Sequence, residues 1–309
     1  MGKPYIVLGA GSIGRRHYDN LTILGADARL VPWREAGDLS VLDGAAGAVI
    51  ATATNVRTKP IAACAARGIP MYIEKPLAYR ATDVTALMDV VQPVASRSVA
   101  GFMMRYHPAF LSLIEEPIDA FGFHLEIGHD VRQWRQNWRF ADSYAANPEG
   151  GGVLLDLCHE IDMAACLFPG LKITAVNATG HDDFPGVDFA TRISLTNGSS
   201  TGEVVMDYLT PAGVRHIALR GRKEALDLDL LACQAKRWSA DSTGNQSWQF
   251  ERNDMFLALM RDFMALVEGR EPSDNPLLPR LDRVAESAAL IAQAWEARTF
   301  HGTIAGGFE

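Results

Sequence analysis

Short apolar runs recur along the first hundred residues and are separated by segments with helical spacing. The runs occupy residues 5–8, 28–31, 48–51, 71–73 and 99–103. Apolar residues at helical spacing fill two of the gaps, at 60–67 and 81–91. Strands that alternate with helices predict an α/β fold, a doubly wound parallel sheet with helices on both faces. Ligands of such sheets bind at the carboxyl ends of the strands.

The pattern changes in the rest of the chain, where apolar and polar residues alternate as in half-exposed strands. The alternation is clear at 121–130, and Asn197-Gly198 separates two further alternating runs, which is typical of a hairpin. A second hairpin is expected to turn at 221–223. The segments 253–268 and 281–298 carry apolar stripes at helical spacing and are expected to pack as helices.

These patterns predict two domains, at residues 1–118 and 119–309. The second is expected to be α+β, with a mostly antiparallel sheet that has helices on one face. The other face of that sheet must meet either a second subunit or solvent. We favour a second subunit, and a solvated polar face is the alternative.

The run GAGSIG follows the first apolar run and opens a helical pattern. In this context GxGxxG is the fingerprint of a dinucleotide-binding turn. Gly9 permits the tight turn, Gly11 lets the backbone approach a pyrophosphate, and Gly14 lets the helix pack closely on the strand. The helix N-terminus, at Ser12 and Ile13, offers N–H groups to the phosphates. A glycine-rich turn without a ligand is the alternative.

The end of the second apolar run indicates which dinucleotide is preferred. Folds that prefer NAD usually offer an Asp or Glu here to the ribose 2′-hydroxyl. This chain instead has Pro32, Trp33 and Arg34, and a guanidinium suits a 2′-phosphate. Arg34 is therefore a candidate NADP contact, and Trp33 is a candidate contact of the adenine. The alternative is that Arg34 is solvated and Glu35 binds the ribose of NAD.

Polar residues follow the third and fourth apolar runs, at the edge where ligands bind. Thr52, Thr54 and Asn55 follow the third run, and Glu74 and Lys75 follow the fourth. We expect these five residues to contact the cofactor. Lys75 is also placed to hydrogen-bond a reacting oxygen and to favour its anionic form. A surface lysine after a strand is the alternative.

The run GGGVLLDLCHEID, residues 150–162, combines glycines, apolar residues and charges. Its residues are compatible with a helix from Val153 onward. On a helix, Asp156 and His159 share a face because they are three residues apart, and Glu160 lies near that face. A carboxylate and a histidine on one face form an acid/base pair that works near neutral pH. The alternative is a helix N-terminus whose carboxylates are favoured by the helix dipole.

Aromatic residues and arginines gather before this run. They are Arg132, Trp134, Arg135, Trp138, Arg139 and Tyr144. Aromatic rings and guanidinium groups in one loop are suited to a polyhydroxylated or anionic substrate. A packed connecting loop with solvated arginines is the alternative.

Composition narrows the functional class. Apolar residues make up 48% of the 309 residues and charged residues make up 21%. The net charge of −8 argues against nucleic acid as a partner, because surfaces that bind nucleic acid are rich in Lys and Arg. The four cysteines have no CxxC pairing or metal-ligand spacing, so neither a disulfide framework nor a metal site is expected. No apolar stretch approaches a membrane span or a signal peptide. These observations predict a soluble cytoplasmic protein.

Five motifs in order give the chain its resemblance to a known family. They are GAGSIG, the run ATATN at 51–55, EKP at 74–76, GFMMRYHPAF at 101–110, and GGGVLLDLCHEID. Together they resemble the Gfo/Idh/MocA oxidoreductases, named after glucose–fructose oxidoreductase and inositol dehydrogenase. The resemblance covers essentially the whole chain. It implies an N-terminal Rossmann domain that binds NAD or NADP, and a C-terminal domain that covers the nicotinamide.

The resemblance also implies roles for single residues. Lys75, as the lysine of EKP, would lie near the nicotinamide and the substrate. The family's aspartate and histidine are usually four residues apart, whereas Asp156 and His159 are three apart. On a continuous helix this step turns His159 by about 100° and puts Glu160 in the usual histidine position. We still assign His159 as the acid/base, with Asp156 orienting it or contacting the substrate.

The implied activity is an NAD(P)-dependent dehydrogenase or reductase that acts on a CH–OH group of a sugar, cyclitol or sugar acid. The predicted substrate contacts are Arg105, Trp138, Tyr144, Asp156, His159 and Glu160. The family's C-terminal sheet is large and open-faced and usually forms the oligomer interface, which implies a homodimer or homotetramer. A non-catalytic NAD(P)-binding sensor, or a hydrolase or lyase that uses tightly bound NAD+ internally, are the alternatives.

Overall fold

The structure, a computed structural model, describes residues 2–133 and 139–307. Its contacts divide the chain into two units. The first comprises Met1–Tyr106 and Glu251–Ala289, and the second comprises His107–Phe250 and Leu290–Glu309. The predicted division at residue 118 has a single crossing between domains. The observed division differs because a helix near the C-terminus packs in the first unit.

The first unit contains a sheet of five parallel strands. The strands are β1 (Tyr5–Leu8), β2 (Ala28–Val31), β3 (Gly47–Ile50), β4 (Met71–Ile73) and β5 (Val99–Ala100). Their order is β2-β1-β3-β4-β5, and each neighbouring pair is parallel. Every residue of β1, β3 and β4 is buried, as expected for continuous apolar runs between two helix layers. The predicted parallel sheet is therefore confirmed.

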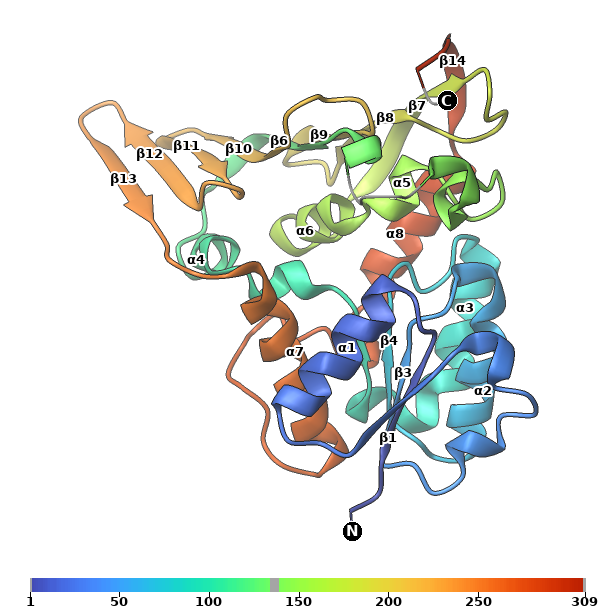
Figure 1. Ribbon diagram of the computed structural model, residues 1–309. Coiled ribbons are helices and arrows are strands. Elements are labelled where there is room, and N and C mark those ends of the chain that lie inside the picture. Colours follow the sequence, from blue (N-terminus) through green and yellow to red (C-terminus); the bar gives the residue numbers. More distant parts are fainter. Residues whose placement is uncertain (1, 134–138, 308–309) are drawn as a thin grey trace. The chain divides into compact units, whose positions relative to one another are not determined.

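Helices lie on both faces of this sheet (Figure 1). On one face are α1 (Ser12–Ile23) and α7 (Arg252–Val267), and on the other are α2 (Thr58–Ala66) and α3 (Ala81–Val91). The apolar stripe of α7 brings the late helix back to this unit. The ring of its Phe263 lies 6.1 Å from that of Tyr5 and 6.0 Å from that of Tyr72.

The second unit contains a sheet of nine strands in the order β13-β12-β11-β10-β6-β9-β8-β7-β14. The strands are β6 (Ala120–Gly128), β7 (Lys172–His181), β8 (Ala190–Thr196), β9 (Thr201–Asp207), β10 (Val214–Gly221), β11 (Glu224–Asp229), β12 (Gln234–Ser239), β13 (Thr243–Ser247) and β14 (Thr299–Ile304). Within the described residues of this sheet, the pairs β6–β9 and β7–β14 are parallel and the other pairs are antiparallel. The mostly antiparallel sheet and both predicted hairpins, β8–β9 and β10–β11, are confirmed.

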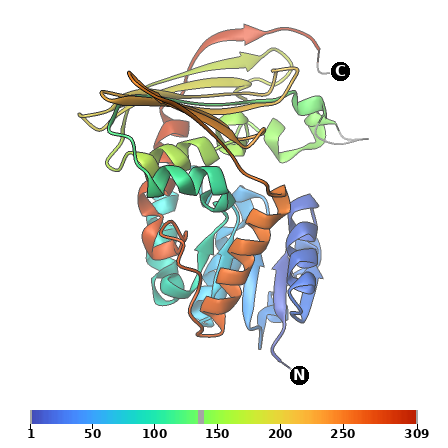
Figure 2. The ribbon, with the colours of Figure 1, turned by 90° about the vertical axis from the view of Figure 1, so that its left-hand side faces the viewer.

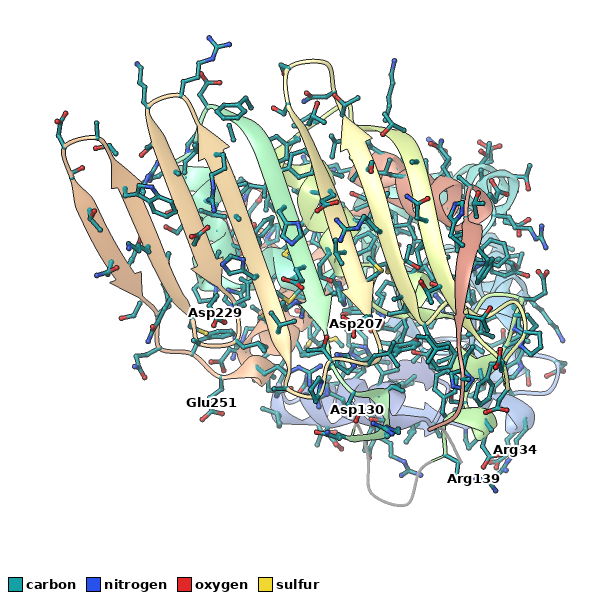
Figure 3. All side chains as sticks on the ribbon, turned by 90° about the horizontal axis from the view of Figure 1, so that it is seen from above. Arg34, Asp130, Arg139, Asp207, Asp229 and Glu251 are labelled. Atoms are coloured by element: carbon teal, nitrogen blue, oxygen red, sulfur yellow. The ribbon has the colours of Figure 1, made fainter. Side chains whose placement is uncertain are left out.

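The other helices are α4 (Pro108–Glu115), α5 (Val153–Asp156), α6 (His159–Leu167) and α8 (Ala285–Glu296), and the division between the units falls within α8. The helices α5 and α6 contact the sheet through β8, β9 and β6. Figure 2 shows the helices of this unit on one face of the sheet. Figure 3 looks onto the opposite face, where side chains of the described strands project away from the helices.

Among the described residues, no helix is both long and apolar enough to cross a bilayer.

Candidate active site

The glycine turn after β1 has the shape that a dinucleotide needs. Gly9 adopts a φ of 108°, and a Cβ there would lie 2.5 Å from the carbonyl oxygen of Ala51. A Cβ on Gly14 would lie 1.8 Å from the carbonyl oxygen of Gly9, so only glycine lets α1 approach β1 this closely. A Cβ on Gly11, in contrast, would meet nothing within 4 Å. Two of the glycines are therefore required by packing, and the third leaves space beside the backbone.

This space is suited to a pyrophosphate. The helix α1 begins at Ser12 with Gly11 as its N-cap, and no side chain caps it. The first N–H groups of a helix have no partner within the helix, and the helix dipole attracts an anion to them. The amides of Ser12 and Ile13 lie in this first turn, as predicted. The turn therefore fits the phosphates of NAD or NADP.

The chain after β2 presents Arg34 and Glu35 together. Both belong to a short 3-10 helix at Trp33–Glu35. The side chain of Arg34 is 87% exposed, that of Glu35 is 60% exposed, and Nε of Arg34 lies 3.5 Å from Oε1 of Glu35. A solvent-exposed ion pair of this kind contributes little to stability. Arg34 is therefore accessible to a phosphate, while Glu35 is near enough to compete for its guanidinium.

A buried arginine, which sequence reasoning missed, organises the ends of β3 and β4. Arg57 is 3% exposed and donates to the carbonyl oxygens of Glu74 and Pro76 and, at 2.6 Å, of Thr52. Thr52 and Lys75 are sequence-predicted cofactor contacts, and the same guanidinium fixes the backbone beside both. Arg57 lacked a sequence signal because its importance depends on carbonyl groups up to 19 residues away.

The predicted polar residues after β3 differ in exposure. Thr52 is 6% exposed, and its Oγ1 is buried without a hydrogen-bond partner. Such a hydroxyl is costly unless a ligand or water completes it. Thr54 and Asn55 lie in the short 3-10 helix Thr54–Val56, where Thr54 is half-buried and Asn55 is exposed. Thr52 is therefore the residue of this group with an observed need for a partner.

Glu74 forms a buried pair with His17, another residue that sequence reasoning missed. Nε2 of His17 lies 2.7 Å from Oε1 of Glu74, and both residues are buried. Burial raises the pKa of Glu74, but the hydrogen bond from His17 and the surrounding positive charges outweigh it and lower that pKa. A Cβ on Gly101 would lie 3.1 Å from this carboxyl group. The carboxylate supports the turn from within, and Lys75, the next residue, is half-buried.

In the second unit, two tyrosines hold the carboxylate of Asp156, which is 6% exposed. The hydroxyl of Tyr144 donates to Oδ1, and that of Tyr208 donates to Oδ2 at 3.0 Å. Tyr144 is 52% exposed, whereas Tyr208 is fully buried. Burial, followed by the charge of Asp156, raises the pKa of Tyr208 well above its ordinary value. Tyr208 therefore remains a proton donor to the carboxylate at any physiological pH.

The helix that was expected to be continuous from Val153 is interrupted between the two candidate acid/base residues. The helix α5 ends at Asp156, and α6 begins at His159. Between them Leu157 has φ −104° and ψ 25°, and Cys158 has ψ 1°. The expectation that Asp156 and His159 share one face of a continuous helix is therefore wrong, because the backbone leaves helical geometry between them.

Glu160, which stands in the position expected for the histidine, has a different partner. Its Oε1 accepts a 2.6 Å hydrogen bond from Nε of Arg215 in β10, and Glu160 is 1% exposed. A buried carboxylate requires such a partner. His159, at the first position of α6, is 5% exposed. The Glu160–Arg215 ion pair favours His159 over Glu160 as the acid/base.

The remaining predicted substrate contacts have mixed outcomes. Arg105 is 5% exposed and donates to Oγ of Ser287 at 3.1 Å and to the carbonyl oxygen of Leu277 at 3.3 Å, which favours a structural role. Arg132 pairs with the buried Asp130 at 2.8 Å. The residues Trp134, Arg135 and Trp138 lie outside the described residues.

Among the described residues, no cluster of three His, Cys, Asp or Glu side chains is arranged to hold a metal ion.

Comparison with known proteins shows similarity at the level of the fold. No protein-family model and no curated protein matches the chain. The UDP-N-acetylglucosamine 3-dehydrogenase GnnA from Acidithiobacillus ferrooxidans is 16% identical, with a TM-score of 0.74 over 96% of this chain and 97% of that one. KijD10, a 3-ketoreductase from Actinomadura kijaniata in complex with NADP and TDP-benzene, is 15% identical, with a TM-score of 0.77 over 98% and 99%. Levoglucosan dehydrogenase in complex with NADH is 18% identical, with a TM-score of 0.73 over 96% and 97%.

Two of these neighbours are dehydrogenases, named for UDP-N-acetylglucosamine and for levoglucosan, and the third is a 3-ketoreductase. The similarity extends over nearly the whole of each chain. It confirms the predicted fold, a Rossmann-like unit joined to a unit with a large sheet. At 15–18% identity it is a likeness of fold, so the chemistry must be argued from the side chains.

Proposed function

We propose that this protein is an NAD(P)-dependent oxidoreductase of the Gfo/Idh/MocA type that acts on a carbinol or keto carbon of a sugar, cyclitol or sugar acid. The glycine turn carries the proposal: Gly9 and Gly14 are required by packing, while the space beside Gly11 is open to a pyrophosphate. The names of the structural neighbours support the substrate class, since they are sugar dehydrogenases and a ketoreductase.

The candidate residues have complementary roles in this reaction. A bound nicotinamide would accept or donate the hydride. Lys75 would hydrogen-bond the substrate oxygen and stabilise its developing negative charge. His159 would take the hydroxyl proton during oxidation and return it during reduction. Asp156, held by Tyr144 and Tyr208, would fix the substrate or the imidazole in the reactive orientation.

NADP is the proposed preferred cofactor. Pro32 and Trp33 stand where NAD-preferring folds have a carboxylate, and the exposed guanidinium of Arg34 follows them. An arginine can bind a 2′-phosphate with two parallel hydrogen bonds. Trp33, half-buried in the same short helix, would contact the adenine.

The decisive experiment combines cofactor binding with turnover. Titration of the protein with NAD+ and NADP+ should raise its melting temperature, and a panel of sugars and sugar acids should then give absorbance of NAD(P)H. Lys75→Met should lower kcat by about 100-fold to 1,000-fold, as for other lost oxyanion donors. Lys59→Met, at an exposed lysine of α2, is the matched control and should leave turnover unchanged.

Other outcomes would redirect the assignment. Dinucleotide binding without turnover of any polyol or keto-sugar would support a sensor. Turnover without consumption of added cofactor would support a hydrolase or lyase with internally recycled NAD+. No thermal shift with either dinucleotide would overturn the proposal.

We also propose that the protein is a cytoplasmic homodimer or homotetramer that associates through the open face of the nine-stranded sheet. Ion pairs between side chains that alternate with the buried residues of the strands, such as Arg192–Glu203 at 2.5 Å, give this face a defined charge pattern. None of the four cysteines, all of which are described, forms a disulfide, which suits a reducing compartment. Light scattering coupled to gel filtration should give two or four times the mass of the chain, and a monomer mass would contradict the proposal.

A further inference from the structure

A buried ion pair lies behind the short helix that carries Asp156. Asp188 is fully buried, just before β8, and its Oδ1 accepts from Nη1 of Arg298. The side chain of Arg298 is 8% exposed, lies with its guanidinium carbon 4.3 Å from the ring centre of Trp295, and donates through Nε to the carbonyl oxygen of Trp295 at 2.9 Å. Two charges removed from water in this way are costly unless their geometry is fixed by further hydrogen bonds.

Asp188 uses its remaining acceptors to hold the beginning of α5. Its Oδ2 accepts from the amide of Leu154 at 2.9 Å and from Oγ1 of Thr191 at 2.9 Å. Its backbone carbonyl accepts from the amide of Val153 at 2.9 Å. Both amides belong to the first turn of α5, whose N–H groups have no partner within the helix. One residue therefore completes the start of the helix that ends at Asp156.

The glycine before α5 is adapted to the same carboxylate. Gly152 has a φ of 90°, and a Cβ there would lie 2.1 Å from Oδ1 of Asp188. The residue after Asp188 continues the connection, because the carbonyl oxygen of Phe189 accepts from the amide of Tyr208 at 2.9 Å. Tyr208 in turn donates to Asp156. Both the backbone that carries Asp156 and one donor to its carboxylate are thus set from the segment at 188–189.

We propose that Asp188 and Arg298 are positioning residues for Asp156, acting through the first turn of α5. This inference rests on the proposed function, since it presumes that Asp156 acts in the reaction. Arg298 orients the side chain of Asp188, Asp188 fixes the amides of Val153 and Leu154, and the single turn of α5 transmits that placement. A displacement of about 1 Å at a reacting group can lower a rate about 100-fold.

The test uses a neutral replacement of the pair, because removal of one partner leaves a buried charge and can unfold the chain. The variant combines Asp188→Asn with Arg298→Met. Arg237→Lys is the control: Arg237 in β12 pairs with Glu224 at 2.6 Å, four strands away from β9 in the sheet. Melting temperature reports folding, and amide hydrogen exchange of the peptide 150–158 reports the order of α5.

In the folded double variant, we expect exchange of peptide 150–158 to accelerate at least 10-fold, kcat to fall by about 10-fold to 100-fold, and the pH profile of kcat to shift. The control variant should change none of these. Unchanged exchange and an unchanged pH profile in the folded double variant would overturn the proposal, as would a loss of kcat that equals the loss of folded protein.

Asp156→Asn separates this inference from the proposed function. Wild-type turnover in Asp156→Asn would remove Asp156 from the reaction, and the proposed mechanism would fail even if exchange at 150–158 depended on Asp188. A large loss of kcat in Asp156→Asn, with no change of kcat or exchange in the folded double variant, would refute the positioning role alone.

Discussion

The hydroxyl of Tyr208, directly after β9, donates a 3.0 Å hydrogen bond to Oδ2 of Asp156 at the end of α5. Tyr208 is fully buried and remains protonated because burial and the neighbouring carboxylate raise its pKa. A buried carboxylate requires such a donor. The hydrogen bond joins two residues 52 positions apart and fixes the orientation of the Asp156 side chain.

Replacement of Tyr208 by Phe should therefore leave one oxygen of the Asp156 carboxylate without its donor and loosen its orientation. If Asp156 orients the substrate or His159, kcat should fall by up to about 100-fold, because a displacement of about 1 Å at a reacting group can lower a rate by that factor. The lost hydrogen bond should also lower the free energy of unfolding by about 1–3 kcal/mol. Tyr144→Phe removes the donor to the other oxygen and should lower kcat in the same way. An unchanged kcat in both folded variants would show that neither hydrogen bond is needed to position Asp156 for the reaction.

Replacement by alanine of two glycines in the turn after β1 should affect different properties, stability at Gly14 and dinucleotide binding at Gly11. Gly14→Ala places a Cβ 1.8 Å from the carbonyl oxygen of Gly9, so α1 must move away from β1. We expect the free energy of unfolding to fall by about 1–3 kcal/mol, or by more. Gly11→Ala meets nothing within 4 Å and should fold normally, but its methyl group should weaken dinucleotide binding at least 10-fold. Denaturant titration and binding titration distinguish the two effects.

Arg34→Ala should weaken NADP+ binding more than NAD+ binding. The loss of a charged contact to the 2′-phosphate should raise the Kd for NADP+ by about 10-fold or more, since hydrogen bonds to charged groups contribute about 1.5–3 kcal/mol. Arg29→Ala, at an exposed arginine of β2, is the matched control. If Arg34→Ala changes both dissociation constants equally, Arg34 does not select the cofactor, and Glu35 becomes the residue to replace.

His107 should make the stability depend on pH. Burial lowers its pKa to about 4, opposed in part by its hydrogen bond to the carbonyl oxygen of Leu230 and reinforced by the charge of Arg215. The unfolded chain, with a histidine pKa of about 6.5, therefore binds a proton first as the pH falls. The stabilisation is complete above about pH 6.5 and is lost progressively toward pH 4, by up to about 3 kcal/mol.

The check is denaturant unfolding at several values of pH between 4 and 7. His107→Gln should flatten the slope of unfolding free energy against pH in this range. The exposed His301, replaced by Gln, should leave that slope as in the wild type. Identical slopes in the wild type and in His107→Gln would show that His107 is not the group responsible.

The local pattern of the sequence predicted the first unit well. Continuous apolar runs predicted β1, β3 and β4, because strands covered on both faces need apolar residues at every position. The run predicted at 99–103 formed only the short strand Val99–Ala100. The return of α7 to this unit could not be predicted, since an apolar stripe shows that a helix packs but not against which partner.

The candidate site shows the same limit. The sequence identified Gly9, Gly11, Gly14, Lys75 and Asp156 from motifs that are local and contiguous. His17, Arg57 and Asp188 support these residues but have no motif, because each acts through contacts with distant segments. The break between Asp156 and His159 was also hidden, since every residue there is compatible with a helix.

Local periodicity and short motifs along the chain are enough to specify the two kinds of sheet, the glycine turn after β1 and the residue types available for chemistry. The tertiary structure decided which of those residues are already engaged. The buried residues Arg105 and Glu160 are held by partners from distant segments, and Arg298 reaches Asp188 across 110 positions of the chain. A buried charge must find its partner wherever the fold brings one within reach. No pattern along the chain specifies that partner.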